Sequence, residues 1–372
     1  MHYGNYPDLS CVRRILVIKM RHHGDVLLTT PLFSKLHALL PHAAIDACIY
    51  KDTLPMLEGH PGIADFVLYD KQWKKLPLFK RILKEVALLK RVRSGKYDLV
   101  INLTEGDRGA ILAKVSGSLL RVGFDPGKSG FFGKRKTWTH VVKNCPHPRH
   151  TVERQLDALR RIGIFPEAEE KDLFLHIPDS ALCNVRNRLE QEEIRPGSYI
   201  LIHPVSRWKF KCLSIQQMVQ LIVALDKRGM RIVLSAGPDL EECAMVDKIL
   251  SLLPSAVSVV NLAGKLTLKE LAALITMSRA LICVDSVPLH IASATKTPVV
   301  ALFGPTSDQN WGPWMHRRSK VVSHPFSCRP CYQDGCGGSK VSDCLLAISQ
   351  GAILSALDEV LGERSQLLDH VF

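Results

Sequence analysis

The stretch KMRHHGDVLLTTP, residues 19–31, places charged and imidazole side chains directly after a continuous aliphatic run. Asp25 could accept a proton from a substrate hydroxyl as a general base, and the cations around it could hold an anionic substrate. Alternatively, Asp25 caps a helix that begins at Val26, and the dipole of that helix would lower its basicity. The cationic and imidazole members of the stretch are Lys19, Arg21, His22 and His23.

The stretch HPVSRWKFK, residues 203–211, combines a hydroxyl group with amines. Ser206 could donate a hydrogen bond to a phosphate, and Lys209 and Lys211 could each reach a pyrophosphate as point charges. A solvated basic loop is the alternative interpretation.

Residues 285–290, DSVPLH, follow another aliphatic run. Asp285 and Ser286 suit the N-cap of a helix, whose N–H groups and dipole would attract an anion. His290 lies one turn further along. An ordinary capped helix with a core histidine would leave the same pattern.

In residues 237–242, GPDLEE, Glu241 could bind ribose hydroxyls, as acidic residues do in nucleotide sites. Alternatively, Asp239 and Glu241 only complement a helix N-terminus. Residues 303–314, FGPTSDQNWGPW, either shape a pocket wall around Trp311 or only form turns. The chain contains no P-loop motif, no dinucleotide-binding glycine motif and no D-x-D pair. We therefore expect no metal ion and no cofactor, with lysines, a histidine and a helix N-terminus neutralising a pyrophosphate instead.

The elements that must position these residues alternate along the chain. Short aliphatic runs, such as 14–19 and 97–103, are typical of strands buried on both faces, and amphipathic helical patterns separate them. This order predicts parallel sheets covered by helices, in which ligands bind beyond the carboxyl ends of the strands. Further strands are predicted at 43–50, 65–70, 198–206, 231–237, 257–264 and 280–284.

Two Rossmann-like halves joined near residue 180 fit this order. We expect domains at 1–180 and 181–345, and a C-terminal helix in 346–372 that packs back on the body. Residues 124–150 are rich in Gly, Lys, Arg, Pro and His, and are predicted to form a long surface loop.

The composition describes a globular protein with 46% apolar and 23% charged residues and a net charge of +13. With no run of about 18 apolar residues and no apolar N-terminal segment, we expect a cytoplasmic protein. The positive charge suits nucleic acid, an acidic membrane face or a phosphorylated substrate. The amphipathic stretch 76–96 could hold the chain near anionic lipid, or could simply expose a solvated basic face. Its cations are Lys80, Arg81, Lys84, Lys90, Arg91 and Arg93.

Taken together, these loops resemble glycosyltransferase family 9, the lipopolysaccharide core heptosyltransferases, and within it the heptosyltransferase III group. The resemblance runs from ILVIKMRHHGDVLLTTPL through HPVSRWKFKCL and VDSVPLHIASATKTPVVALFGPTSDQNWGPW to CRPCYQDGCGGSKVSDCL. It implies an α/β GT-B fold, with two Rossmann-like domains facing across a cleft. The implied reaction is inverting transfer from ADP-L-glycero-β-D-manno-heptose to the lipid A-linked inner-core oligosaccharide. It would take place at the cytoplasmic face of the inner membrane.

The resemblance also implies roles for individual residues. Asp25 matches the catalytic base, and the cations near it would bind a phosphorylated heptose of the acceptor. Ser206 and Lys211 match the groups that hold the donor pyrophosphate, with Lys209 as a rival to Lys211, and Glu241 matches the acid on the adenosine ribose. The donor-binding D-[ST]-x-x-x-H pattern matches Asp285, Ser286 and His290. The first domain would then bind the acceptor and the second ADP-heptose.

Two further alternatives remain open. Cys328, Cys331, Cys336 and Cys344 have the residue type and number of a zinc site, or are reduced thiols in a loop. The chain could also be another sugar-nucleotide enzyme of the same fold, or a basic module that binds nucleic acid or a membrane surface. Nucleic acid is not expected as a partner, because no aromatic-rich basic strand is present.

Overall fold

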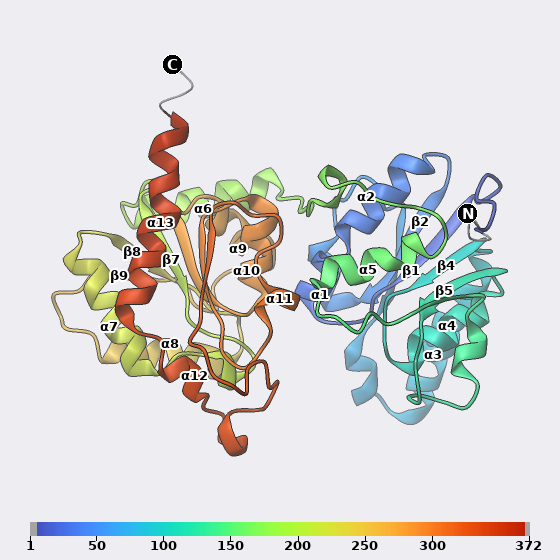
Figure 1. Cartoon of the computed structure of the whole chain (residues 1–372). Coiled ribbons are helices and arrows are strands. Elements are labelled where there is room, and N and C mark those ends of the chain that lie inside the picture. The colour runs from blue at the N-terminus through green and yellow to red at the C-terminus, as the bar shows by residue number, and fades with distance from the viewer. Residues whose placement is uncertain (1–5, 369–372) are drawn as a thin grey trace. The chain divides into compact units, whose positions relative to one another are not determined.

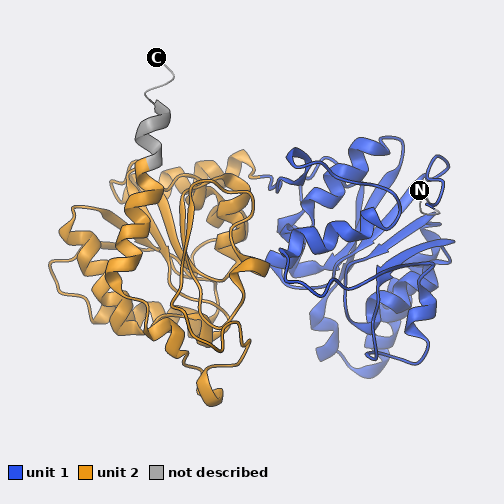
Figure 2. Cartoon of the chain, viewed as in Figure 1, with its two compact units in different colours: residues 1–176 blue, residues 177–372 orange. Residues whose placement is uncertain are grey.

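The computed structural model describes residues 6–368, with side chains described through Gly362. The chain forms two compact units, residues 1–176 and 177–372, which are coloured separately in Figure 2. The boundary at residue 176 lies close to the predicted junction near 180. Each unit contains one six-stranded parallel sheet with helices on its faces (Figure 1).

The sheet of unit 1 has the strand order β3-β2-β1-β4-β5-β6. Its strands are β1 (Arg14–Ile18), β2 (Ala44–Tyr50), β3 (Asp65–Tyr69), β4 (Leu99–Asn102), β5 (Leu120–Phe124) and β6 (His140–Val142). Its α-helices are α1 (His23–Leu27), α2 (Thr30–Leu39), α3 (Leu78–Ser94), α4 (Asp107–Ser116) and α5 (Thr151–Arg160). Short 3₁₀ turns, η1 to η4, lie at Lys51–Met56, Lys71–Lys75, Lys134–Thr137 and Glu169–Lys171. The order of strands is that of a Rossmann fold.

The sheet of unit 2 has the order β12-β11-β10-β7-β8-β9, which is the same arrangement. Its strands are β7 (Tyr199–His203), β8 (Arg231–Leu234), β9 (Val259–Asn261), β10 (Ala280–Val284), β11 (Val299–Leu302) and β12 (Ser319–Val322). Its α-helices are α6 (Asp179–Gln191), α7 (Ile215–Lys227), α8 (Leu240–Ser251), α9 (Leu268–Thr276), α10 (Val287–Thr295), α11 (Asp308–Trp311), α12 (Asp343–Leu346) and α13 (Gln350–Leu368), with 3₁₀ turns η5 (Lys209–Lys211) and η6 (Cys336–Gly338). Helices α6, α9 and α10 pack together, while α7, α8 and α13 share one core with the sheet.

The predicted strands that consist of aliphatic runs are confirmed, because burial on both faces selects such runs. The central strands β1, β4, β7 and β10 are almost entirely buried. The local sequence also fixes several helix starts. Ser214 and Gln217 form a capping box at α7, and Thr267 and Glu270 form another at α9. The predicted C-terminal helix is α13, which packs on β11 and β12 of unit 2.

Two edge strands, β6 and β12, and the strand β5 next to an edge escaped the sequence analysis. The stretch 124–150 is not one long loop, because it contains η3 and β6. β5, β6 and β12 are short and keep exposed or half-exposed positions, so they lack the continuous apolar run that marks a buried strand.

In each sheet, the order in which the chain adds strands reverses at one point. From β1 the chain builds outward through β2 and β3 and then returns to place β4 on the other side of β1. Unit 2 does the same with β10 beside β7. Ligands of open α/β sheets bind at such switch points, beyond the carboxyl ends of the strands. The loops with predicted chemistry follow β1, β7, β8, β10 and β11.

One glycine near the switch point of unit 1 supplies a test of this framework. A Cβ at Gly109 in α4 would lie 2.2 Å from Asn102 Oδ1. The buried Asn102 amide cannot move away without losing its hydrogen bonds to the backbone of Thr104. Gly109→Ala should therefore lower the free energy of unfolding by about 1–3 kcal/mol, although alanine usually favours a helix.

Urea denaturation followed by circular dichroism measures this change. Gly351→Ala in α13 is the matched control, since no atom lies within 4 Å of a Cβ built there. That variant should be neutral or slightly stabilising. Equal behaviour of the two variants would contradict the steric argument.

Candidate functional site

The loops after β1 and β4 are tied together at the switch point of unit 1. The Met20 N–H donates to Thr104 Oγ1 at 2.8 Å, and Lys19 Nζ donates to the Leu103 carbonyl at 3.3 Å. The Asn102 side chain donates to the Thr104 carbonyl and accepts from the Thr104 N–H. These bonds hold the two loops as one frame.

Asp25 lies within this frame, in the first turn of α1. Its Oδ1 is 3.7 Å from Lys19 Nζ, and the two side chains are 11% and 8% exposed. The alternative in which Asp25 caps a helix starting at Val26 is wrong, because α1 begins at His23 with His22 as the N-cap. His22 still has an extended backbone, and the helical conformation begins at His23, two residues before Asp25.

The Lys19 ammonium is largely buried beside Asp25 and does not lie on the open surface. Burial lowers the pKa of Lys19, while the negative charge of Asp25 acts in the opposite direction. The ammonium group is therefore stabilised mainly by Asp25 and by the Leu103 carbonyl. Its predicted contact with the acceptor stays a prediction.

The other predicted acceptor residues lie further out. Arg21 and His22 are exposed, and His23 Nε2 lies 2.9 Å from the Asp52 carbonyl. Arg21 is near enough to Glu105 to help lower the pKa of that carboxyl. Their roles with a substrate also stay predictions.

Helix α5 adds residues that sequence reasoning missed. Arg154 Nη2 donates to Glu105 Oε1 at 2.7 Å, and Gln155 Nε2 donates to the Asp25 carbonyl at 3.4 Å. Burial opposes ionisation of Glu105, but Arg154, Arg21 and Lys19 outweigh it and lower its pKa. Glu105 is therefore a carboxylate already held by a guanidinium.

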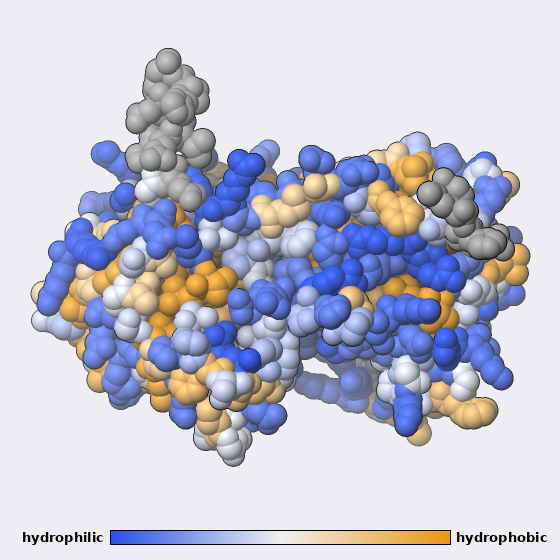
Figure 3. All heavy atoms as spheres, in the orientation of Figure 1, coloured by the Kyte–Doolittle hydropathy of each residue, from blue (hydrophilic) through white to orange (hydrophobic). Residues whose placement is uncertain are grey.

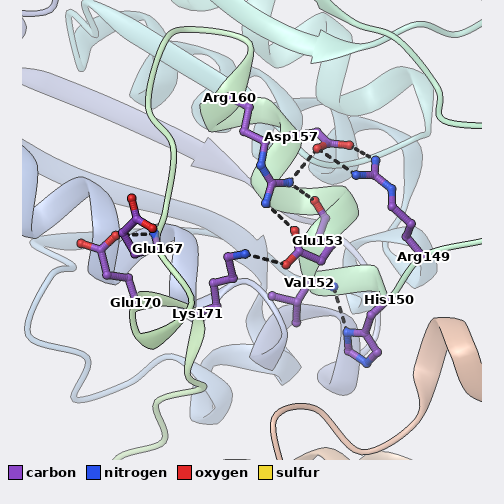
Figure 4. A network of polar contacts seen from close by, with 9 residues as sticks. All are labelled: Arg149, His150, Val152, Glu153, Asp157, Arg160, Glu167, Glu170 and Lys171. Carbon is purple, nitrogen blue, oxygen red and sulfur yellow. Dashed lines mark hydrogen bonds and ion pairs between the residues drawn. The ribbon is translucent and has the colours of Figure 1, made fainter.

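A network of ion pairs fixes the other side of α5 (Figure 4). Asp157 pairs with both Arg149 and Arg160, and Glu153 pairs with Arg160 and with Lys171, the latter at 2.9 Å. The surface over this helix is largely hydrophilic (Figure 3). Linked charges of this kind hold geometry better than isolated surface pairs, so α5 presents Arg154 and Gln155 in a defined orientation.

At the switch point of unit 2, three loops converge on one carboxylate. Lys211 Nζ lies 2.6 Å from Asp285 Oδ2, and Thr306 Oγ1 donates to the same oxygen at 2.7 Å. Asp285 is 5% exposed, whereas the Lys211 side chain keeps 17% exposure. Asp285 thus fixes Lys211 after β7 from its own place after β10. Thr306 was missed as an individual residue, although its loop was predicted to shape a pocket wall.

Ser286 is the N-cap of α10, but its side chain caps no N–H group. Its hydroxyl instead donates to the Val284 carbonyl at 3.2 Å. The start of this nine-residue helix therefore has no side-chain cap. Pro288 carries no N–H, and the Leu289 N–H donates to the Ser286 carbonyl at 3.1 Å. The Val287 N–H is therefore the group best placed to face an anion. His290 is buried one turn later, with its ring 6.5 Å from that of Trp311.

His203 is the last residue of β7, and Ser206 lies in the loop that follows it. Ser206 is largely buried, and its Oγ accepts from the Trp208 N–H at 3.3 Å. His203 Nδ1 lies 3.0 Å from Ser235 Oγ, which ties β7 to β8. Burial lowers the pKa of His203 to about 4, so this imidazole is neutral at physiological pH.

Lys209 of η5 and Glu241 in the first turn of α8 form a second pair, at 3.0 Å. Both side chains are more than half exposed, so the pair contributes little stability and can open for a ligand. Asp239 is the N-cap of α8, accepting from the Glu241 and Glu242 N–H groups, as its alternative role predicted. The Glu241 carboxylate is left for its contact with Lys209.

Comparisons with known proteins agree with this geometry. The model of glycosyltransferase family 9 (heptosyltransferase) matches residues 86–341. The chain is 36% identical to Lipopolysaccharide heptosyltransferase 3 of Escherichia coli over 297 residues, which cover 79% of this chain and 84% of that protein.

The chain belongs to glycosyltransferase family 9.

Two solved structures of heptosyltransferases are similar in fold. E. coli heptosyltransferase WaaC with ADP-2-deoxy-2-fluoro heptose has a TM-score of 0.68 at 17% identity, covering 93% of this chain and 99% of that one. The iron-containing heptosyltransferase TibC of enterotoxigenic E. coli, in complex with ADP-D-β-D-heptose, has a TM-score of 0.52 at 14% identity, covering 95% and 77%. The fold is α/β and of the GT-B type, as predicted.

No cluster of three or more His, Cys, Asp or Glu side chains in the described part of this family 9 chain is arranged to hold a metal ion. Among the four cysteines of residues 328–344, Cys344 is buried and Cys336 Sγ accepts from the Asp343 N–H at 3.4 Å. Burial raises the pKa of the Cys344 thiol. All four are free cysteines in this geometry.

The placement of Asp25 gives a sharp test in this family 9 enzyme. Asp25→Asn should lower the rate of sugar transfer by about 10²–10⁴-fold, because asparagine keeps the size but cannot accept a proton. The affinity for ADP should stay nearly unchanged, since Asp25 belongs to unit 1. Stability should fall, because the buried Lys19 ammonium then keeps only the Leu103 carbonyl, and thermal melting checks that the variant is folded at the assay temperature. Initial rates and calorimetric titration with ADP measure the two quantities.

Glu105→Gln is the matched control, because it neutralises the other carboxylate at the same edge. We expect a smaller loss of rate, since Glu105 is engaged by Arg154. A hundred-fold loss of rate in Glu105→Gln (roughly 2.7 kcal/mol), with only a few-fold loss in Asp25→Asn, would identify Glu105 as the general base instead of Asp25.

Substitution of each of the two lysines after β7 should change the affinity for ADP to a different extent. Lys211→Met should weaken ADP binding by about 10–100-fold, as expected for losing a charge-assisted hydrogen bond of ~1.5–3 kcal/mol. Lys209→Met should cost less than about threefold, because its exposed side chain must be ordered on binding. Calorimetry measures both affinities, and thermal melting checks that Lys211→Met stays folded without the partner of Asp285. The opposite ranking would identify Lys209 as the pyrophosphate ligand.

Proposed function

We propose that this chain transfers a heptose from ADP-L-glycero-β-D-manno-heptose to the inner-core heptose of lipopolysaccharide. The observation that carries the proposal is the 36% identity that extends over most of Lipopolysaccharide heptosyltransferase 3. A lysine, a hydroxyl-bearing loop and an uncapped helix start also gather at the unit 2 switch point. Such groups suit a nucleotide pyrophosphate.

In this proposal unit 2 binds the donor. Lys211 and the Val287 N–H at the start of α10 stabilise the charge on the pyrophosphate as the bond to the sugar breaks. Ser206 donates a hydrogen bond to the same phosphates, and Glu241 accepts from the ribose hydroxyls. Lys209 pairs with the Glu241 carboxylate in the free protein, and its ammonium would contact a phosphate instead when ADP-heptose binds.

Unit 1 binds the acceptor. Asp25 removes the proton from the attacking hydroxyl as that oxygen forms its bond to the anomeric carbon and ADP departs. A direct displacement of this kind inverts the anomeric centre. The exposed Arg21 and His22 suit phosphate groups on the acceptor.

We infer that the reaction needs no metal ion. Lysine charge and a helix N–H group supply what Mg²⁺ supplies at other nucleotide sites. TibC contains iron, so metal dependence has to be measured directly.

The transfer assay combines ADP-heptose with truncated core acceptors, read by mass spectrometry. We expect one added heptose in EDTA as well as in Mg²⁺, and an α-linked product by NMR. Loss of transfer in EDTA with recovery on adding Mg²⁺ or iron would refute metal independence but leave heptosyl transfer standing. Binding of ADP without transfer to any core acceptor would favour another sugar-nucleotide reaction.

The acceptor is anchored by lipid, so we further propose that the enzyme works peripherally at the anionic cytoplasmic face of the inner membrane. Within the described residues, no helix is both long and apolar enough to cross a bilayer. The net charge of +13 favours attachment to an anionic surface.

A further inference from the structure

Helix α3 of unit 1 exposes an apolar face that its own fold does not cover. Residues four apart lie in one row along a helix, and two adjacent rows of α3 carry only large apolar side chains in its first half. These side chains are 39–72% exposed. They are Leu78, Ile82 and Val86 in one row and Phe79 and Leu83 in the next.

The exposed apolar side chains lie on a helix whose second half is packed in the core. Leu88 and Val92, in its second half, are buried in the core that α3 shares with α4. On the side facing that core, Glu85 pairs with Arg108 at 2.8 Å and accepts from the Tyr69 hydroxyl at 3.3 Å. The first half of α3 is thus presented to the outside by a fixed second half.

Lysines border the apolar rows. Lys80 and Lys84 form the next row around the helix, and Lys74 and Lys75 precede it in η2. All four are exposed, and none of them has an ion-pair partner among residues 6–362. Large apolar side chains bordered by uncompensated lysines are the pattern of helices that lie in a membrane interface.

We propose that the first half of α3 docks on an anionic lipid surface, with its two apolar rows inserted among the lipids and its lysines on the headgroups. The charge decides between this occupant and a second copy of the chain. A two-fold symmetric contact through the same face would gather the uncompensated lysines of both copies around one apolar contact, and like charges at close range oppose that contact.

This inference rests on the proposed function and makes it more specific. A lipid-anchored acceptor is confined to the membrane surface, so an enzyme docked through unit 1 meets it at high local concentration. Docking should therefore matter for acceptors embedded in a bilayer and not for short water-soluble acceptors.

The test uses the full chain and two double variants. Phe79→Ser with Leu83→Ser removes apolar groups, and Lys80→Glu with Lys84→Glu reverses charges. In flotation with vesicles of phosphatidylcholine and phosphatidylglycerol, each should reduce bound protein at least ~10-fold. The wild-type chain should bind vesicles of phosphatidylcholine alone much more weakly.

Matched controls lie elsewhere on the surface. Leu119→Ser removes an apolar side chain that is 84% exposed outside α3, and Lys227→Glu with Lys248→Glu makes the same change in net charge on unit 2. Both should bind anionic vesicles like the wild type. If the controls lost binding equally, net charge or general apolarity would explain the attachment, and the assignment to α3 would fail.

Activity separates this proposal from the proposed function. Both α3 variants should transfer heptose to a soluble truncated acceptor at the wild-type rate and lose transfer to a vesicle-embedded acceptor. Wild-type vesicle binding by both variants would overturn the docking surface while leaving heptosyl transfer intact. A change from dimer to monomer in Phe79→Ser with Leu83→Ser, measured by light scattering without loss of vesicle binding, would assign the face to a second copy instead.

Discussion

The reversal of strand order in each sheet is the constraint on which the positions of the candidate residues depend. On either side of the β1–β4 and β7–β10 pairs, the chain leaves the sheet in opposite directions. The connections that follow these strands therefore leave toward opposite faces of the sheet, and only their first residues meet at the carboxyl edge, as the hydrogen bonds between the loops after β1 and β4 show.

Buried charged groups lie at both edges, and each needs a partner that compensates its charge. An ion taken out of water is costly unless a partner compensates it, and Lys19 and Asp285 are both almost completely buried. Each is compensated from another loop or element, Lys19 by Asp25 and the Leu103 carbonyl, and Asp285 by Lys211 and Thr306. Apolar residues would fill the same space more cheaply, which is an argument that these groups serve chemistry and not stability.

The sequence predicts the parts of this arrangement that are local. Buried parallel strands are aliphatic runs, and the residues after them lie at one edge by topology alone, so the loops around Asp25, Lys211 and Asp285 can be found from residue types and their order. Edge strands such as β6 and β12 cannot, because solvent-facing positions carry no apolar signal. The partners of Arg154 and Thr306 also cannot be predicted from the sequence. The two contacts join residues 49 and 21 positions apart, and nothing in the local pattern of α5 or of residues 303–314 selects the partner.

The two edges differ in what they leave available to a ligand. Lys19 Nζ is 3.7 Å from Asp25, which is an ion-pair distance but too long for a hydrogen bond, so the carboxylate keeps its capacity to accept. Lys211 is hydrogen-bonded to Asp285 at 2.6 Å through one N–H and retains two further donors on a side chain that reaches solvent. At the unit 1 edge the Asp25 carboxylate can therefore accept a hydrogen bond, and at the unit 2 edge the Lys211 ammonium can donate. The proposed reaction uses both: the acceptor hydroxyl would lose its proton to the Asp25 carboxylate, and the donor pyrophosphate would be stabilised by Lys211.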